Sequence, residues 1–76
     1  MAPLEVLRRQ RLLSQRDLAQ RAGIAQSTVY LIENGRTRPR LKVMRAICQA
    51  LGVQPTDVDE FRAVIGVERE RSRVAA

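Results

Sequence analysis

Histidine and tryptophan are absent from this 76-residue chain, and cysteine, tyrosine and phenylalanine occur once each. Without histidine and with a single thiol, at Cys48, the sequence has no Cys/His cluster of the kind that binds zinc and cannot form an internal disulfide. We therefore expect no metal and no cofactor, and the lone thiol fits a reducing compartment. Because aromatic residues make up only 3% of the chain, aliphatic side chains must fill its core.

Long apolar runs and catalytic motifs are also missing. No run approaches the ~18 apolar residues that a membrane-spanning helix requires, and the N-terminal stretch MAPLEVLRRQ has no apolar segment typical of a signal peptide. We therefore expect a cytoplasmic protein with no membrane partner. The glycine-rich phosphate loop G-x-x-x-x-G-K-[ST] does not occur, and the carboxylates lie at helix starts and on charged faces, so we expect no enzymatic activity.

The net charge of +6 is unevenly distributed along the chain. Residues 1–45 hold ten basic side chains against three acidic ones, a net charge of +7, whereas residues 46–76 hold four against five, a net charge of −1. A basic surface confined to one part of a protein is typical of nucleic-acid binding. The alternative interpretation is a solvated surface in an arginine-rich proteome, because 13 of the 14 basic residues are arginine.

Helical patterning dominates the sequence, with no hairpin signal and no sustained alternation of a strand. It predicts an all-α fold, a compact five-helix domain over residues 1–66, and a charged tail over residues 67–76 that either extends the last helix or is disordered. The first four helices are expected at residues 3–12, 15–22, 25–34 and 41–51. Thr56 is expected to cap the fifth helix, with Asp59 in its first turn. Its inward-facing residues are expected to be Val58, Phe61 and Ile65.

Local signals mark where the second helix begins and ends. Ser14 is expected to cap it, with Asp17 as the acidic partner of a capping box. Gly23 ends it, because glycine readily adopts positive φ. Ala19 and Gly23 are both small, so the second and third helices are able to meet at a sharp corner. Cys48 falls on the apolar stripe of the fourth helix, and we interpret it as a packing residue.

The third expected helix has two unlike faces. At about 100° per residue, Ala25, Val29 and Ile32 fall on one side, which we expect to pack into the domain. Five residues occupy the opposite side, namely Gln26, Ser27, Tyr30, Leu31 and Asn34. Amide, hydroxyl and aliphatic groups can contact base edges in a major groove. An ordinary solvated helix face would carry more charge, whereas this face is uncharged except for Glu33 at its border.

The stretch QRDLAQRAGIAQSTVYLIENG, residues 15–35, resembles the helix-turn-helix of the phage repressor/Cro (Xre-type) DNA-binding family. Seven residues match it at the family spacing, namely Gln15, Leu18, Ala19, Gly23, Ile24, Val29 and Ile32. Residues 7–15 resemble the family's first helix, and residues 39–53 resemble its fourth. The resemblance implies a lambda-repressor-like fold, double-stranded DNA as the partner, and a prokaryotic or phage protein located at the nucleoid.

The same resemblance implies a role for each matching residue. Base contacts are implied for Gln26, Ser27, Tyr30 and Leu31, with Gln26 bidentate to adenine. Contacts to the DNA backbone are implied for Gln15, Asn34, Arg36, Arg38 and Arg40. Gln15 also braces the third helix, and Arg8 and Glu33 form a structural ion pair between the first and third helices.

Five positions depart from the family pattern. Ala25 replaces the usual Ser or Thr cap of the third helix, at a cost of about 1 kcal/mol, and Arg40 replaces a common Ser cap before the fourth. Leu12 stands where glycine is frequent. Tyr30 and Leu31 stand where a small polar residue and a basic residue are common. Leu31 either contacts a thymine methyl group or is an exposed apolar residue that serves a protein contact.

These observations predict sequence-specific binding of double-stranded DNA by a small, repressor-like transcriptional regulator. Two alternatives remain open. One is the antitoxin of a toxin–antitoxin pair, which binds a toxin as well as operator DNA, and the other is a protein-interaction adaptor with the same fold. Because one recognition helix reads only a few base pairs, we expect a homodimer on a near-palindromic operator. Phe61 is expected to pack inward, with Val64 and Val67 at the dimer interface.

Overall fold

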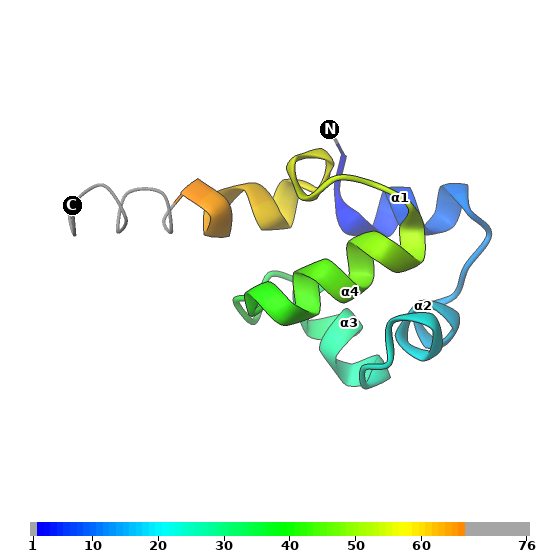
Figure 1. Cartoon of the computed structure of the whole chain (residues 1–76). Helices are drawn as coiled ribbons and strands as arrows, with labels where there is room; N and C mark the ends of the chain where they lie inside the picture. Colours follow the sequence, from blue (N-terminus) through cyan, green and yellow to red (C-terminus); the bar gives the residue numbers. More distant parts are fainter. Residues whose placement is uncertain (1, 67–76) are drawn as a thin grey trace.

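The computed structural model describes residues 2–66, which form helices joined by short turns (Figure 1). The first four helices are α1 (Leu4–Gln10), α2 (Gln15–Ala22), α3 (Gln26–Glu33) and α4 (Leu41–Leu51). A 3-10 turn, η1 (Pro55–Asp57), precedes the C-terminal helix, whose described part covers residues 59–66. Within residues 2–66 there is no strand beyond an isolated bridge between Ala2 and Val58. The prediction of an all-α five-helix fold is confirmed.

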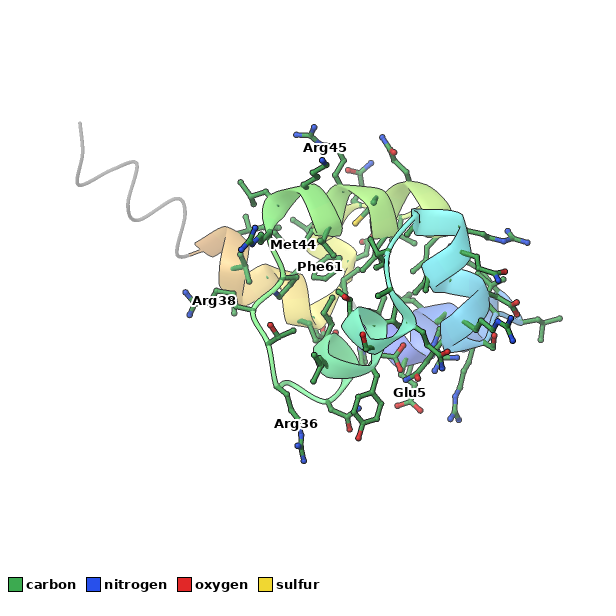
Figure 2. All side chains as sticks on the ribbon, turned by 90° about the horizontal axis from the view of Figure 1, so that it is seen from below. Glu5, Arg36, Arg38, Met44, Arg45 and Phe61 are labelled. Atoms are coloured by element: carbon green, nitrogen blue, oxygen red, sulfur yellow. The ribbon has the colours of Figure 1, made fainter. Side chains whose placement is uncertain are left out.

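Aliphatic side chains fill the core between the helices. The longest helix within residues 2–66, α4, contributes four buried residues to it, namely Met44, Ile47, Cys48 and Leu51. The single phenylalanine, Phe61, is fully buried, as predicted, and lies with Met44 between α4 and the C-terminal helix (Figure 2). Cys48 is a buried packing residue, also as predicted, and burial raises the pKa of its thiol. None of the described helices is long and apolar enough to cross a bilayer.

The corner between α2 and α3 forms from the local signals that predicted it. Ser14 Oγ accepts a hydrogen bond from Asp17 N at 3.0 Å, and Asp17 Oδ2 accepts one from Ser14 N at 3.1 Å, which completes a capping box. The hydrogen bond from the Ser14 backbone N–H, followed by interaction with the Ser14 side chain, lowers the pKa of the Asp17 carboxyl. At the other end Gly23 has φ 70°, and Ile24 N donates to Ala19 O at 2.9 Å. Ala19 is buried, so the two helices approach closely there.

The first helix ends at Gln10, two residues earlier than predicted. Leu12 adopts a left-handed conformation, with φ 57°. This is the position at which glycine is frequent in the family that the sequence resembles. Leu12 N donates to Arg9 O at 2.9 Å and Leu13 N to Arg8 O at 3.2 Å, the hydrogen bonds of a Schellman motif. The turn directs Leu13 into the core, whereas the side chain of Leu12 is 91% exposed. Because leucine has a high helix propensity, the sequence predicted a helix through Leu12 and not a turn.

The prediction that Thr56 caps the fifth helix is wrong. Thr56 lies inside η1. Asp57 Oδ2 accepts a hydrogen bond from Gln54 N at 2.9 Å and so caps the start of this turn. The C-terminal helix begins only at Asp59, because Val58 pairs in an extended conformation with Ala2. In this bridge Ala2 N donates to Asp57 O, and Asp59 N donates to Ala2 O, both at 3.0 Å. A contact between the start of the chain and Val58 therefore decides where the last helix begins.

Val64 lies in the protein's own core. Its side chain is only 7% exposed and packs in the same buried cluster as Phe61. Burial within the domain therefore already removes from solvent most of a side chain that we expected at a dimer interface. Ile65 is only partly buried. Val67 and the predicted tail over residues 67–76 lie outside the described residues.

Candidate nucleic-acid interface

The two faces of α3 separate as the helical wheel predicted, with one exception. Val29 and Ile32 are buried in the core, with 0% and 1% of their surface exposed. The opposite face is open to solvent, and its exposed residues are Gln26, Ser27, Tyr30, Leu31 and Asn34. The exception is Ala25, which is exposed because it stands before the first turn of α3 rather than within the helix. The outer face of α3 thus presents amide, hydroxyl, phenol and aliphatic groups without a charge of its own.

A buried polar network fixes α3 to α1 and α2. Arg8 Nε donates to Glu33 Oε2 at 2.7 Å, and Arg8 Nη2 donates to Glu33 Oε1 at 3.0 Å, so the ion pair implied by the resemblance is present and bidentate. Arg8 Nη1 also donates to Leu13 O at 2.8 Å, at the turn between α1 and α2. The hydrogen bond to Glu33 holds the pKa of Arg8 above its ordinary value.

Gln15 connects α2 directly to this network. Its amide Nε2 donates to Glu33 Oε1 at 3.0 Å, so the first residue of α2 holds the last residue of α3. Arg8, Gln15 and Glu33 therefore join three helices through charge-assisted hydrogen bonds, which are stronger than neutral ones. Such bonds keep the exposed face of α3 in one orientation before any ligand arrives.

The start of α3 has no side-chain cap. Ala25 has the extended backbone typical of a capping residue, but its methyl group accepts no hydrogen bond. The backbone N–H groups in the first turn of a helix carry partial positive charge from the helix dipole. They form a site that favours an anion such as a phosphate oxygen. This site lies directly beside the exposed Gln26 and Ser27.

The end of α3 is tied to the loop that follows. Asn34 Nδ2 donates to Tyr30 O at 2.8 Å, and Arg36 N donates to Leu31 O at 2.9 Å. The amide of Asn34 therefore stabilises the end of the helix, and only its remaining donor and acceptor are available to a ligand. These two hydrogen bonds determine how the chain leaves α3 toward Arg36.

The loop between α3 and α4, residues 35–40, places arginine side chains in solvent. Arg36, Arg38 and Arg40 are all exposed, whereas Pro39 is buried and anchors the loop to the domain. Figure 2 shows Arg36 and Arg38 extending outward from this loop. Guanidinium groups placed in this way can bind phosphate oxygens in a bidentate manner. Along the described chain the loop directly follows the uncharged face of α3.

Most of the predicted site residues are therefore exposed and lie in one stretch of the chain, α3 and the loop that follows it. Gln15 is the exception in orientation, because its amide is directed at Glu33 rather than at solvent. Sequence reasoning missed Glu60, whose Oε1 accepts a hydrogen bond from Leu4 N at 2.8 Å and so caps α1 from the C-terminal helix. No local signal reveals a cap that lies 56 positions away. Among the described residues no group of His, Cys, Asp or Glu is arranged to hold a metal ion.

Comparison with known proteins agrees with this geometry. A model for the helix-turn-helix domain matches residues 2–61. The chain is also 34% identical over 61 residues to an uncharacterized HTH-type transcriptional regulator, YozG, of Bacillus subtilis (strain 168), and the alignment covers 79% of this chain and 73% of that protein. No solved structure matches the chain significantly. The match over most of the chain and the fold just described together show that this protein belongs to the helix-turn-helix domain family.

Proposed function

We propose that this protein is a small transcriptional regulator, repressor-like in action, that binds double-stranded DNA with sequence specificity. One observation carries the proposal. The outer face of α3 is exposed and uncharged, it is held rigidly by the buried Arg8–Glu33 pair, and exposed arginines follow it in the chain. The named relative, a transcriptional regulator of the HTH type, supports the same function.

In this proposal α3 lies in the major groove and reads base edges directly. The amide of Gln26 can donate to and accept from one adenine, a bidentate contact that discriminates against other bases by about 1–3 kcal/mol. Ser27 and Tyr30 supply hydroxyl groups to neighbouring bases. Leu31 contacts a thymine methyl group, since its side chain is exposed on the same face.

The DNA backbone is bound by the groups that flank α3. Arg36, Arg38 and Arg40 contact phosphates on one side, and the uncapped N-terminus of α3 is available to another phosphate. Gln15 and Asn34 add backbone contacts only with the hydrogen-bonding capacity that Glu33 and Tyr30 leave unused. Such contacts set the position of the protein on the duplex but carry no sequence information.

A near-palindromic operator and a homodimer complete the proposal. A single α3 contacts too few base pairs to select one site in a genome. Two copies related by a two-fold axis place their recognition helices about 34 Å apart, one turn of the duplex. The protein then acts in the cytoplasm, at the nucleoid. An antitoxin that also binds a toxin, or an adaptor that binds only protein, is distinguished from this function by the following experiment.

The test is a binding selection from random duplex DNA, followed by titration of the selected site at increasing salt. A dimer that uses three arginines per copy contacts about six phosphates, which predicts a slope of log affinity against log salt near −5. Replacing Arg36 with Ala in both copies should make the slope shallower by about two units. Failure to enrich any sequence, together with an affinity that does not change with salt, would reject DNA binding and favour a protein partner.

A further inference from the structure

A groove lies beside α4, and none of the residues that line it is among the proposed DNA contacts. Its volume is about 630 Å³, and it lies between α4, η1 and the C-terminal helix. Most of its lining is apolar, with contributions from Leu41, Met44, Cys48, Val53 and Ile65. Leu41 is 55% exposed at the edge of the groove, which is a high fraction for a leucine at the start of a helix.

Two opposite charges also line this groove. Arg45 of α4 is exposed, and Figure 2 shows it extending from α4 away from the loop that carries Arg36. Asp57 of η1 belongs to the same lining, and one of its oxygens accepts a hydrogen bond from Gln54 N. Neither Arg45 nor Asp57 forms a salt bridge with another of the described residues. Each is therefore available to an oppositely charged group of a partner.

We propose that a second copy of this chain binds in the α4 groove and that this contact is the dimer interface. It rests on the proposed function, because it supplies the two-fold dimer that a near-palindromic operator requires. In the dimer Leu41 of each subunit enters the groove of the other, close to Met44 and Ile65. Arg45 faces Asp57 of the partner subunit, and the two-fold axis repeats both contacts.

The groove favours a second copy because it is complementary to itself. A two-fold interface uses the same surface patch on both subunits. This patch contains both a projecting apolar side chain, Leu41, and an apolar hollow that can receive one. It also contains one positive and one negative group, so the pairing cancels charge between two copies of a chain whose net charge is +6.

The size of the groove determines how strong the contact is. Eleven residues line it, about half of the 20–30 residues per side in a standard interface. We therefore expect weak dimerisation in free solution. On an operator, DNA holds two copies side by side and raises their effective concentration, so the same contact produces cooperative binding.

The first test measures self-association without DNA by sedimentation equilibrium. Leu41→Glu places a charge in the interface, yet it lies in the first turn of α4, where an acidic residue favours the helix. The matched control is Val6→Glu, which charges another exposed apolar residue on α1, a helix that does not line the groove. Since each dimer contains the substitution twice, Leu41→Glu should weaken dimerisation about 100-fold, whereas Val6→Glu should leave it unchanged.

The second test concerns the charge pair. Arg45→Glu should weaken dimerisation, because the new carboxylate faces Asp57 of the partner subunit. Adding Asp57→Asn should restore much of the lost affinity, since the amide oxygen can still accept the hydrogen bond from Gln54 N. If Arg45→Glu has no effect, or if Asp57→Asn brings no recovery, the proposed pairing of charges is wrong.

A third experiment measures DNA binding by the same variants, and it separates failure of this interface from failure of the proposed function. On a duplex with one half-site of the selected operator, Leu41→Glu should lose only the affinity that repulsion between its carboxylate, next to Arg40, and the phosphates costs. Cooperativity is therefore measured as the ratio of the affinities for two half-sites and for one. On two half-sites only Leu41→Glu should lose cooperativity. If no variant binds DNA, the proposed function fails, while sedimentation still decides the interface. A wild type that stays monomeric in solution and on two half-sites, or equal self-association of Leu41→Glu and Val6→Glu, would overturn the proposal.

Discussion

At the residue scale, the position of α3 depends on Arg8 and Glu33, which share two hydrogen bonds of 2.7 and 3.0 Å. Their side chains are 8% and 4% exposed, so water cannot replace a lost partner. Removing one member of a buried pair leaves an uncompensated charge, which costs about 3–5 kcal/mol. Replacing both with apolar residues avoids that penalty.

We predict that Arg8→Met and Glu33→Leu each lower the free energy of unfolding by about 3–5 kcal/mol. The double variant should lose clearly less than the sum of the two. Urea denaturation in a double-mutant cycle measures the difference. The control is Glu5→Gln, which removes the exposed Glu5–Arg9 pair and should cost less than about 1 kcal/mol. Small, additive effects of the Arg8 and Glu33 variants would show that the network does not hold α3.

Leu12 provides a second residue-scale prediction. A left-handed conformation costs a non-glycine residue about 1–2 kcal/mol, and the exposed side chain of Leu12 offers little packing in return. Glycine removes this strain but adds about 0.5–1 kcal/mol of unfolded-state entropy. Leu12→Gly should therefore raise the free energy of unfolding by a few tenths to about 1 kcal/mol. Thermal and urea denaturation measure the change, and a clear loss of stability would mean that Leu12 has a contact of its own.

Gly23→Ala is the reverse of Leu12→Gly, because it places a side chain where the backbone has positive φ, whereas Leu12→Gly removes one. Gly23 has φ 70°, and a Cβ there meets no atom within 4 Å, so only backbone strain opposes the alanine. The free energy of unfolding should fall by about 1 kcal/mol. Together the two substitutions test whether helix ends in this fold follow backbone conformation rather than side-chain packing.

At the scale of elements, local signals predicted some boundaries, whereas others depend on distant contacts. The limits of α2 and α4 agree with prediction, because Ser14 begins α2 and the glycines Gly23 and Gly52 follow the two helices directly. The start of the C-terminal helix was mispredicted, because it depends on the pairing of Val58 with Ala2. No periodicity within a short window contains information about a partner so far away.

The uncapped start of α3 leads to an element-scale prediction. Ala25→Ser and Ala25→Asp each supply the missing acceptor, and each should raise the free energy of unfolding by about 1 kcal/mol. Their effects on DNA should differ. Ser is neutral, whereas the carboxylate of Asp repels a phosphate at the same helix end. Ala25→Asp should therefore weaken binding to all duplexes, with Ala25→Ser close to wild type.

Urea denaturation and DNA titration of the same samples check this prediction. A pair of variants that are equally stabilised and also bind DNA equally would indicate that no phosphate approaches the start of α3. A variant that gains no stability would show that the first turn of α3 is already satisfied by another group.

At the scale of the whole molecule, the sequence alone indicates a basic surface and a polar helix face. The fold confirms that Val29 and Ile32 are packed and that Gln26 and Tyr30 are exposed. Val64, which we expected at a dimer interface, is almost fully buried within the domain, because a count of apolar residues does not tell which of them the domain buries for itself. Likewise, the α4 groove combines residues from three elements, and their positions depend on the complete packing.

The central claim is that α3 reads bases while the following loop binds only the backbone, and two alanine variants test it most directly. The measurement is the affinity of Gln26→Ala and Arg38→Ala for the selected operator and for unrelated duplex DNA at one salt concentration. Gln26→Ala should lower the ratio of specific to non-specific affinity by about 10-fold to 100-fold, because a bidentate base contact is lost. Arg38→Ala should weaken both affinities equally and leave the ratio unchanged. If both variants weaken both duplexes to the same degree, Gln26 does not read a base and the claim is contradicted.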